Sequence, residues 1–172
     1  MILKLLRGEG PPTGDDLRSD LRKMCSVFLH RDSERCVIAT KFQTPERYGL
    51  YFESDDAVTV TDSTPGDAFG EAVRDAFIAS HRRANDSLGE RKSVKDWPAL
   101  KASKAKSKAQ FDREWICITV QGANEANIIV RMETDPVEHG VSLTKHCNPL
   151  VVERLGGDLI LLKKQYLKWE RA

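Results

Sequence analysis

The order of its apolar segments constrains the fold of this chain more than any other feature. In each half of the sequence, short runs of β-branched and aromatic residues come before a segment with helical apolar spacing. Such runs predict strands, and the spacing that follows them predicts an amphipathic helix. We therefore predict an α+β fold, in which a mainly antiparallel mixed sheet is covered by two to three helices and strands followed by a helix form a pseudo-repeat.

Three strands are predicted in each half, bounded by turn residues. Those of the first half are residues 36–42, 48–53 and 57–61, with a hairpin turn at Ser54-Asp55-Asp56. Those of the second half are residues 115–121, 127–133 and 141–145, with a turn over 122–125.

Three segments have helical spacing. Residues 15–28 carry apolar side chains at Leu17, Leu21, Met24, Cys25 and Phe28, which predicts a helix there. A second helix begins near Thr64 as its cap and Pro65 as its first residue, with His81, Arg82 and Arg83 near its negative end. Its apolar stripe is Phe69, Ala72, Val73, Ala76 and Phe77. A third helix is predicted over residues 152–166 from Leu155, Leu159, Leu162 and Tyr166.

The second and third predicted helices share a step from an apolar residue to glycine. The steps are Phe69-Gly70 and Leu155-Gly156. Glycine early in a helix costs roughly 1 kcal/mol relative to alanine. We therefore expect each helix backbone to lie close to the sheet at this point.

Length and composition are those of an ordinary globular domain. The chain has 172 residues, of which 40% are apolar and 31% charged, and its formal net charge is +1. This length favours a single domain over residues 1–172. Residues 84–110 inside it are polar and weakly patterned, and residues 101–108 fit either a short solvated helix or a loop. The near-zero net charge names no partner.

Sequence motifs give no sign of a signal peptide, a membrane span, a metal site or a cofactor. The apolar N-terminal run is too short for a signal peptide, so we expect a cytoplasmic protein with reduced cysteines. Cys25, Cys36, Cys117 and Cys147 form no C-x-x-C pair, and we expect Cys25 and Cys117 to be buried apolar thiols. No catalytic motif is present, so an enzyme built around Asp55-Asp56 or His139 is the weakest alternative.

Charge is distributed in two blocks of opposite sign. Residues 44–76 are mainly acidic and residues 91–113 mainly basic. Such blocks orient binding partners, although two solvated faces without a partner explain them equally well. The candidate partner-binding residues are Glu53, Asp55, Asp56 and Asp62, and the alternative binding face is Lys101, Lys104, Lys106 and Lys108. A nucleic-acid-binding or regulatory domain that uses the basic 91–113 segment is the alternative function, although Trp97 is its one candidate for base stacking.

Three stretches of the sequence resemble motifs of one known family. Residues 69–82, Phe-Gly-Glu-Ala-Val-Arg-Asp-Ala-Phe-Ile-Ala-Ser-His-Arg, resemble its Leu-Gly-x-Ala helix. Residues 106–111, which run into the segment 115–120, resemble its Lys-x-x-x-x-Phe entry into a central hairpin. The predicted helix with Leu155-Gly156 resembles its C-terminal Ile-Gly-x-Ala-Leu helix. Over roughly residues 48–167 the chain thus resembles the contact-dependent growth inhibition immunity proteins of the CdiI type.

The resemblance implies a bacterial cytoplasmic protein that binds and blocks the toxic C-terminal domain of a delivered effector, often a nuclease. It implies no catalytic residue. Because the clefts of nucleases are usually basic, we expect the carboxylates near Asp55 and Asp56 to face the toxin. Replacing both by Asn is then expected to weaken toxin binding at least about tenfold.

Overall fold

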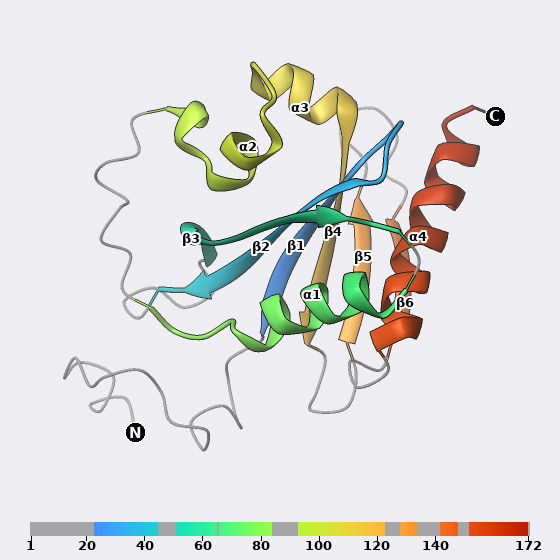
Figure 1. Cartoon of the computed structure of the whole chain (residues 1–172), viewed down its shortest axis with the longest axis horizontal. Helices are drawn as coiled ribbons and strands as arrows, with labels where there is room; N and C mark the ends of the chain where they lie inside the picture. The colour runs from blue at the N-terminus through green and yellow to red at the C-terminus, as the bar shows by residue number, and fades with distance from the viewer. Residues whose placement is uncertain are drawn as a thin grey trace.

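Six strands form one antiparallel sheet in the order β3-β2-β1-β4-β5-β6 (Figure 1). This computed structural model describes residues 23–44, 51–64, 66–83, 93–122, 128–133, 142–147 and 152–171. The strands are β1 (Met24–His30), β2 (Arg35–Gln43), β3 (Tyr51–Asp62), β4 (Trp115–Gly122), β5 (Ile128–Glu133) and β6 (Ser142–Cys147). The predicted α+β fold, with an antiparallel sheet and covering helices, is confirmed.

The helices divide the chain into two units of the same plan. Strands β1 to β3 are followed by α1 (Asp67–Ile78), and strands β4 to β6 by α4 (Val152–Trp169). The two units meet at the centre of the sheet, where β1 pairs with β4. In each unit the following two strands lie progressively further from the centre, so that β3 and β6 are the edge strands. In the sequence, a short 3-10 helix, η3 (Val94–Asp96), and the helices α2 (Pro98–Ser103) and α3 (Lys108–Glu114) come between α1 and β4.

Helices cover both faces of the sheet in its first half. Side chains of α1 and α4 pack on one face, which we call the first face, against residues such as Val27, Ile38 and Ile118. Side chains of α2 and α3 pack on the opposite, second face against Phe28, Val37 and Ala39. Figure 1 shows α2 and α3 on the side of the sheet opposite α1. On the second face of β4 and β5, Cys117 and Arg131 are exposed.

The helix predicted over residues 15–28 is wrong for Met24, Cys25 and Phe28, which lie in β1. Leu17 and Leu21 lie outside the described residues. Strand β1 is buried on both faces, with Cys25 under α1 and Phe28 under α2 and α3. A strand covered on both faces has a continuous apolar run, which periodicity does not separate from a helix.

The predicted hairpin turn at Ser54-Asp55-Asp56 is also wrong. Residues 51–62 form one strand, β3, and both of its ends pair with β2. Ala39 pairs with Val58 whereas Lys41 pairs with Glu53, so residues 54–57 form a bulge opposite Thr40. The turn residues bend the edge strand there without reversing it.

Helix α1 confirms the predicted apolar stripe, with Phe69, Val73 and Phe77 buried, but it begins later than expected. Its N-cap is Gly66, at φ 151°, a conformation that side-chain-bearing residues rarely adopt. Thr64 instead donates a hydrogen bond to Glu34 Oε2 at 3.0 Å.

The basic residues 81–83 do not lie in the last turn of α1. They follow the helix, and the backbone N–H of Arg83 donates to the carbonyl of Gln43 at 2.9 Å. Gln43 and Arg82 form an isolated parallel bridge at the end of β2. The His81 ring remains near the C-terminal end of the helix, with Nδ1 2.8 Å from the carbonyl oxygen of its C-cap residue, Ala79.

The two apolar-glycine steps contact each other. A Cβ atom added at Gly156 of α4 would lie 3.3 Å from the backbone nitrogen of Gly70 and 3.3 Å from Cδ1 of Phe69. The expected close approach to the sheet is therefore corrected to a close approach between the backbones of α1 and α4. Glycine allows the two helices to cross at this distance.

The second half of the chain follows the prediction closely. Strands β4, β5 and β6 coincide with the predicted segments to within three residues at each end, and α4 extends the predicted helix to Trp169. Leu155, Leu159 and Leu162 are buried as expected. Most of the predicted turn over 122–125 lies outside the described residues.

Candidate interaction surface

Helices η3, α2 and α3, with their connecting residues 93–114, form a layer on the second face, which we call the basic layer. Pro98 is the first residue of α2, so η3 and α2 are separate helices. Residues 101–108, for which a helix and a loop were both open, comprise the end of α2, a turn and the start of α3. Ser103 in this segment is buried, so the layer packs on the sheet.

Glu53 holds the N-terminal end of α2. Its side chain reaches from β3 and accepts a hydrogen bond at Oε2 from the backbone N–H of Ala99, at 3.2 Å. Lys41 Nζ on β2 lies 3.1 Å from the other carboxylate oxygen, Oε1. Pro98 has no N–H and Trp97 makes no capping hydrogen bond with its side chain. The Glu53 carboxylate, which comes from β3 and not from α2 itself, therefore supplies the negative charge that a helix N-terminus favours.

Arg35 holds the opposite end of the same helix. From β2, its Nη2 donates to the carbonyl oxygen of Ser103, the last residue of α2, at 3.1 Å. The same guanidinium lies over the Trp115 ring, 5.5 Å from its centroid. An anion at the start of α2 and a cation at its end both complement the helix dipole.

Aromatic side chains fill the space between the basic layer and the sheet. Phe28 lies 5.6 Å from Trp97 and 5.2 Å from Phe111, measured between ring centroids, and Trp97 and Phe111 are 5.2 Å apart. Phe111 stacks on Trp115 at 5.8 Å. Edge-to-face and stacked pairs at these distances add to the stability gained from burial.

The structure separates the four predicted acidic binding residues. Glu53 is only 2% exposed and serves α2, so it does not reach a partner in this conformation. Asp62 is exposed at the other end of β3. Lys41 and Arg35, the β2 residues paired with Glu53 and Asp62, are six positions apart, about 20 Å at roughly 3.3 Å per residue.

Asp55 and Asp56 lie on the bulge of β3 and are directed to different partners. Asp55 Oδ2 is 3.2 Å from Lys101 Nζ of α2. Asp56 accepts two hydrogen bonds from the Arg83 guanidinium, at 3.1 and 2.9 Å. Hydrogen bonds from Arg83 and then Ser54 lower the pKa of the Asp56 carboxyl to about 2. Both carboxylates are exposed and both already have an intramolecular cation.

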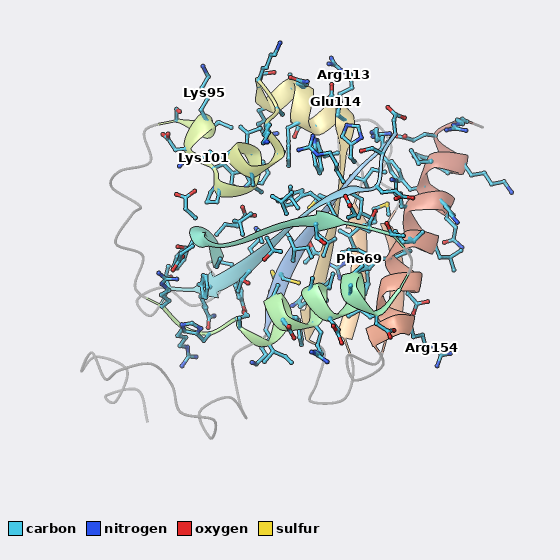
Figure 2. The ribbon with its side chains drawn as sticks, in the orientation of Figure 1. Phe69, Lys95, Lys101, Arg113, Glu114 and Arg154 are labelled. Carbon is cyan, nitrogen blue, oxygen red and sulfur yellow. The ribbon has the colours of Figure 1, made fainter. Side chains whose placement is uncertain are left out.

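The basic residues are on the outer side of the layer. Lys101, Lys104, Lys106 and Lys108, the alternative binding face, are all exposed, and so are Lys95 and Arg113. Figure 2 shows Lys95 and Arg113 projecting from the layer away from the sheet. Lys108 pairs with Asp112 and Arg113 with Glu114, whereas Lys95, Lys104 and Lys106 form no ion pair with another described residue.

Lys104 has an unusual backbone conformation. It ends α2 at φ 62° and ψ 18°, and it is the one residue other than glycine with positive φ in the part of the chain that the structure describes. Glycine or asparagine usually occupies this position, because a larger side chain in the left-handed region is strained. Here the position carries a lysine.

The cysteines differ from one another. Cys25 and Cys36 are buried, and desolvation raises the pKa of the Cys25 thiol to about 12 and that of Cys36 as well. Cys25 is the buried apolar thiol that the sequence predicts. Cys117 is exposed, so the same prediction is wrong for it: strand alternation places it on the second face of β4.

Among the described residues, no group of three or more His, Cys, Asp or Glu side chains is placed to hold a metal ion. His139 lies outside the described residues, as do Arg91 and Lys92 of the basic segment. In the same residues no helix is long and apolar enough to cross a membrane.

The fold and the layer define an α+β domain with an antiparallel sheet and a charged, anchored surface. No family model, curated protein or solved structure matches this chain.

Sequence reasoning missed the residues that hold the layer in place. Lys41, Arg35 and Ala99 had no local signal, because their contacts join positions 12 to 68 residues apart. The one available hint was the mixture of basic residues with Trp97, Leu100 and Phe111 in the 91–113 segment, since apolar residues at such positions indicate packing on a core.

Proposed function

We propose that this chain is a non-catalytic binding protein of the immunity type, which neutralises a toxin domain in the cytoplasm of a bacterium. The sequence resemblance to contact-dependent growth inhibition immunity proteins supports the proposal. Two of the resembling motifs, Phe69-Gly70 and Leu155-Gly156, form the crossing of α1 and α4, so they describe one packing unit. A shared packing unit is consistent with a shared fold. Binding a toxin also requires a suitable surface on the protein.

The observation that carries the proposal is the anchored charged surface on the second face. The basic layer is fixed to the sheet at both ends of α2 and through an aromatic cluster. A surface that is already rigid loses little conformational entropy when a partner binds, which favours high affinity. Exposed charge on such a surface also accelerates the encounter with a complementary partner.

The test is a protection assay. The chain is expressed together with the C-terminal toxin domain of the effector encoded beside it, and growth and complex formation are measured. We expect growth to be restored against this toxin and not against the toxin domain of an unrelated effector, which serves as the control. Calorimetry with the purified pair is expected to give a dissociation constant below about 1 μM. Absence of protection together with absence of binding contradicts the proposal.

The second candidate is nucleic-acid binding through the same lysines, which the exposure of Lys104 and Lys106 favours. Its signature is tight binding of single-stranded RNA that weakens steeply with salt. Finding that signature in a chain that gives no growth protection would replace the immunity proposal by this one.

A further inference from the structure

We infer that the basic layer is the docking surface of this protein, and that its partner is a protein surface rich in carboxylates. The inference rests on the proposed function and names the surface and the chemistry of the partner. It departs from the sequence-based expectation that acidic residues of this chain face a basic toxin cleft.

The first step is the availability of charge. On the acidic side, Asp55 is occupied by Lys101 and Asp56 by Arg83, and Glu53 is buried, so Asp62 at the other end of β3 is the one predicted acidic residue that is exposed without an ion pair among the described residues. On the basic layer, Lys95, Lys104 and Lys106 are exposed and have no ion pair among the described residues. An unpaired exposed charge can bind a partner without first breaking an internal pair.

The second step is the backbone of Lys104. A lysine in the left-handed conformation ends α2, so the turn between α2 and α3 tolerates strain at a residue that glycine would occupy without it. Its amide donates to the carbonyl of Lys101 at 3.1 Å, so the conformation is fixed. The turn therefore holds the backbone of a cationic residue in one orientation, two positions before Lys106.

The third step distinguishes a protein from a nucleic acid as the partner. Binding of single strands needs exposed aromatic side chains on which bases stack. Trp97, the aromatic residue next to these lysines, is half-buried and packs against Phe28 and Phe111. No exposed aromatic side chain accompanies Lys95, Lys104 and Lys106 among the described residues of the basic layer, so single-strand binding lacks its stacking platform there.

The layer also has an apolar component. Val94, beside Lys95, is 52% exposed. A surface that mixes basic, acidic and apolar groups is typical of interfaces between proteins. A polypeptide with carboxylates can face Lys95, Lys104 and Lys106 and also contact Val94 through its apolar groups, whereas the phosphate backbone of a nucleic acid offers charge alone.

The test uses two polyanions as probes, so that it does not depend on the toxin. The isotope-labelled full chain is titrated at low ionic strength with poly-L-glutamate and with poly(U) RNA, and amide chemical shifts are followed. We expect poly-L-glutamate to shift the signals of residues 93–114 and to bind more tightly, per charge, than poly(U). Shifts confined to another surface, or tighter binding of poly(U), overturn the inference.

Charge-reversal variants complete the test. The double variant K104E/K106E is expected to weaken poly-L-glutamate binding at least about tenfold, equivalent to about 1.4 kcal/mol. The control K164E/K168E makes the same charge change at exposed positions of α4 and is expected to change binding less than about twofold. Equal losses in both variants overturn the inference.

The same variants in the growth assay separate the two claims. If the wild-type chain and K104E/K106E both protect, the immunity function stands and the docking surface is wrong. If neither the wild-type chain nor any variant protects, the proposed function fails, whatever the titration shows.

Discussion

The two faces of the sheet are covered by helices in different ways. On the first face, α1 and α4 pack through apolar side chains, both aromatic and aliphatic, and approach each other at Gly70 and Gly156. On the second face, α2 and α3 are short and rely on a buried carboxylate, a guanidinium and an aromatic cluster. The first arrangement buries more apolar side chains and should give most of the stability, because the hydrophobic effect scales with the apolar surface area removed from water. The second places a few specific contacts under a charged surface, as a binding site requires.

The largest effect is expected from the first face. Leu159 of α4 is fully buried in its core. Leu159→Ala should lower the free energy of unfolding by about 2 to 5 kcal/mol, because the substitution leaves a cavity. Leu161→Ala on the same helix is the control: this side chain is 45% exposed, and the change should stay within about 0.5 kcal/mol. Denaturant unfolding measures both, and similar losses in the two variants contradict the assignment of the core.

The helix crossing predicts the next largest effect. Gly156→Val places side-chain atoms against the backbone of Gly70 and the ring of Phe69, which should cost about 1 to 3 kcal/mol by overpacking. A Cβ at Gly157 meets no atom within 4 Å, so Gly157→Ala should raise stability by up to about 1 kcal/mol through helix propensity. Thermal unfolding distinguishes the two, and a stabilised Gly156→Val shows that the helices do not cross there.

The smallest expected effect on stability concerns Asp56 on β3, which is an edge strand of the sheet. Hydrogen bonding to Arg83 lowers the pKa of Asp56 from 3.8 to about 2 in the folded chain. A carboxyl with a lowered folded pKa stabilises the fold at a pH above its unfolded pKa, and this contribution is lost as the pH falls through about 2. The pair is exposed, so the contribution is small.

Titration of the Asp56 carboxyl carbon by NMR measures this shift. In Arg83→Gln the pKa should return toward 3.8, because the main hydrogen-bond donor is lost. An Asp56 that titrates near its ordinary pKa in the wild-type chain contradicts the ion pair with Arg83.

The comparison of the faces also explains what sequence could predict. Elements with one covered face or one apolar stripe, such as α1, α4 and β4, carry a clear period, and the sequence predicts their type correctly, although α1 begins at Asp67 and not at Pro65. Strand β1 is covered on both faces, so its period is hidden. Strand β3 contains turn residues, and the pairing of both its ends with β2 depends on a partner strand that local sequence does not reveal.

Only the part of the candidate surface that depends on local sequence was predictable. The exposure of Lys101 to Lys108 follows from their charge, and the sequence placed them correctly on a polar segment. The role of Glu53 could not be predicted from its charge. A carboxylate that caps a distant helix and an exposed carboxylate that binds another protein have the same local sequence. Its contact with Ala99 joins residues 46 positions apart.

The central claim is that the basic layer is held on the sheet separately from the main core, with Glu53 as an anchor. Native-state hydrogen exchange of Glu53→Gln tests it most directly, with Asp62→Asn as the control at an exposed carboxylate of the same strand. We predict that the Ala99 amide and its neighbours in α2 and α3 lose about 1 to 3 kcal/mol of protection, the usual cost of leaving a buried polar group without its partner. The side-chain amide introduced by the substitution can still accept the hydrogen bond from Ala99, but it offers no negative charge to Lys41 or to the N-terminus of α2. Amides of β1 and β4 should keep theirs, and Asp62→Asn should change neither set. An equal loss of protection across the layer and the central strands would contradict the account.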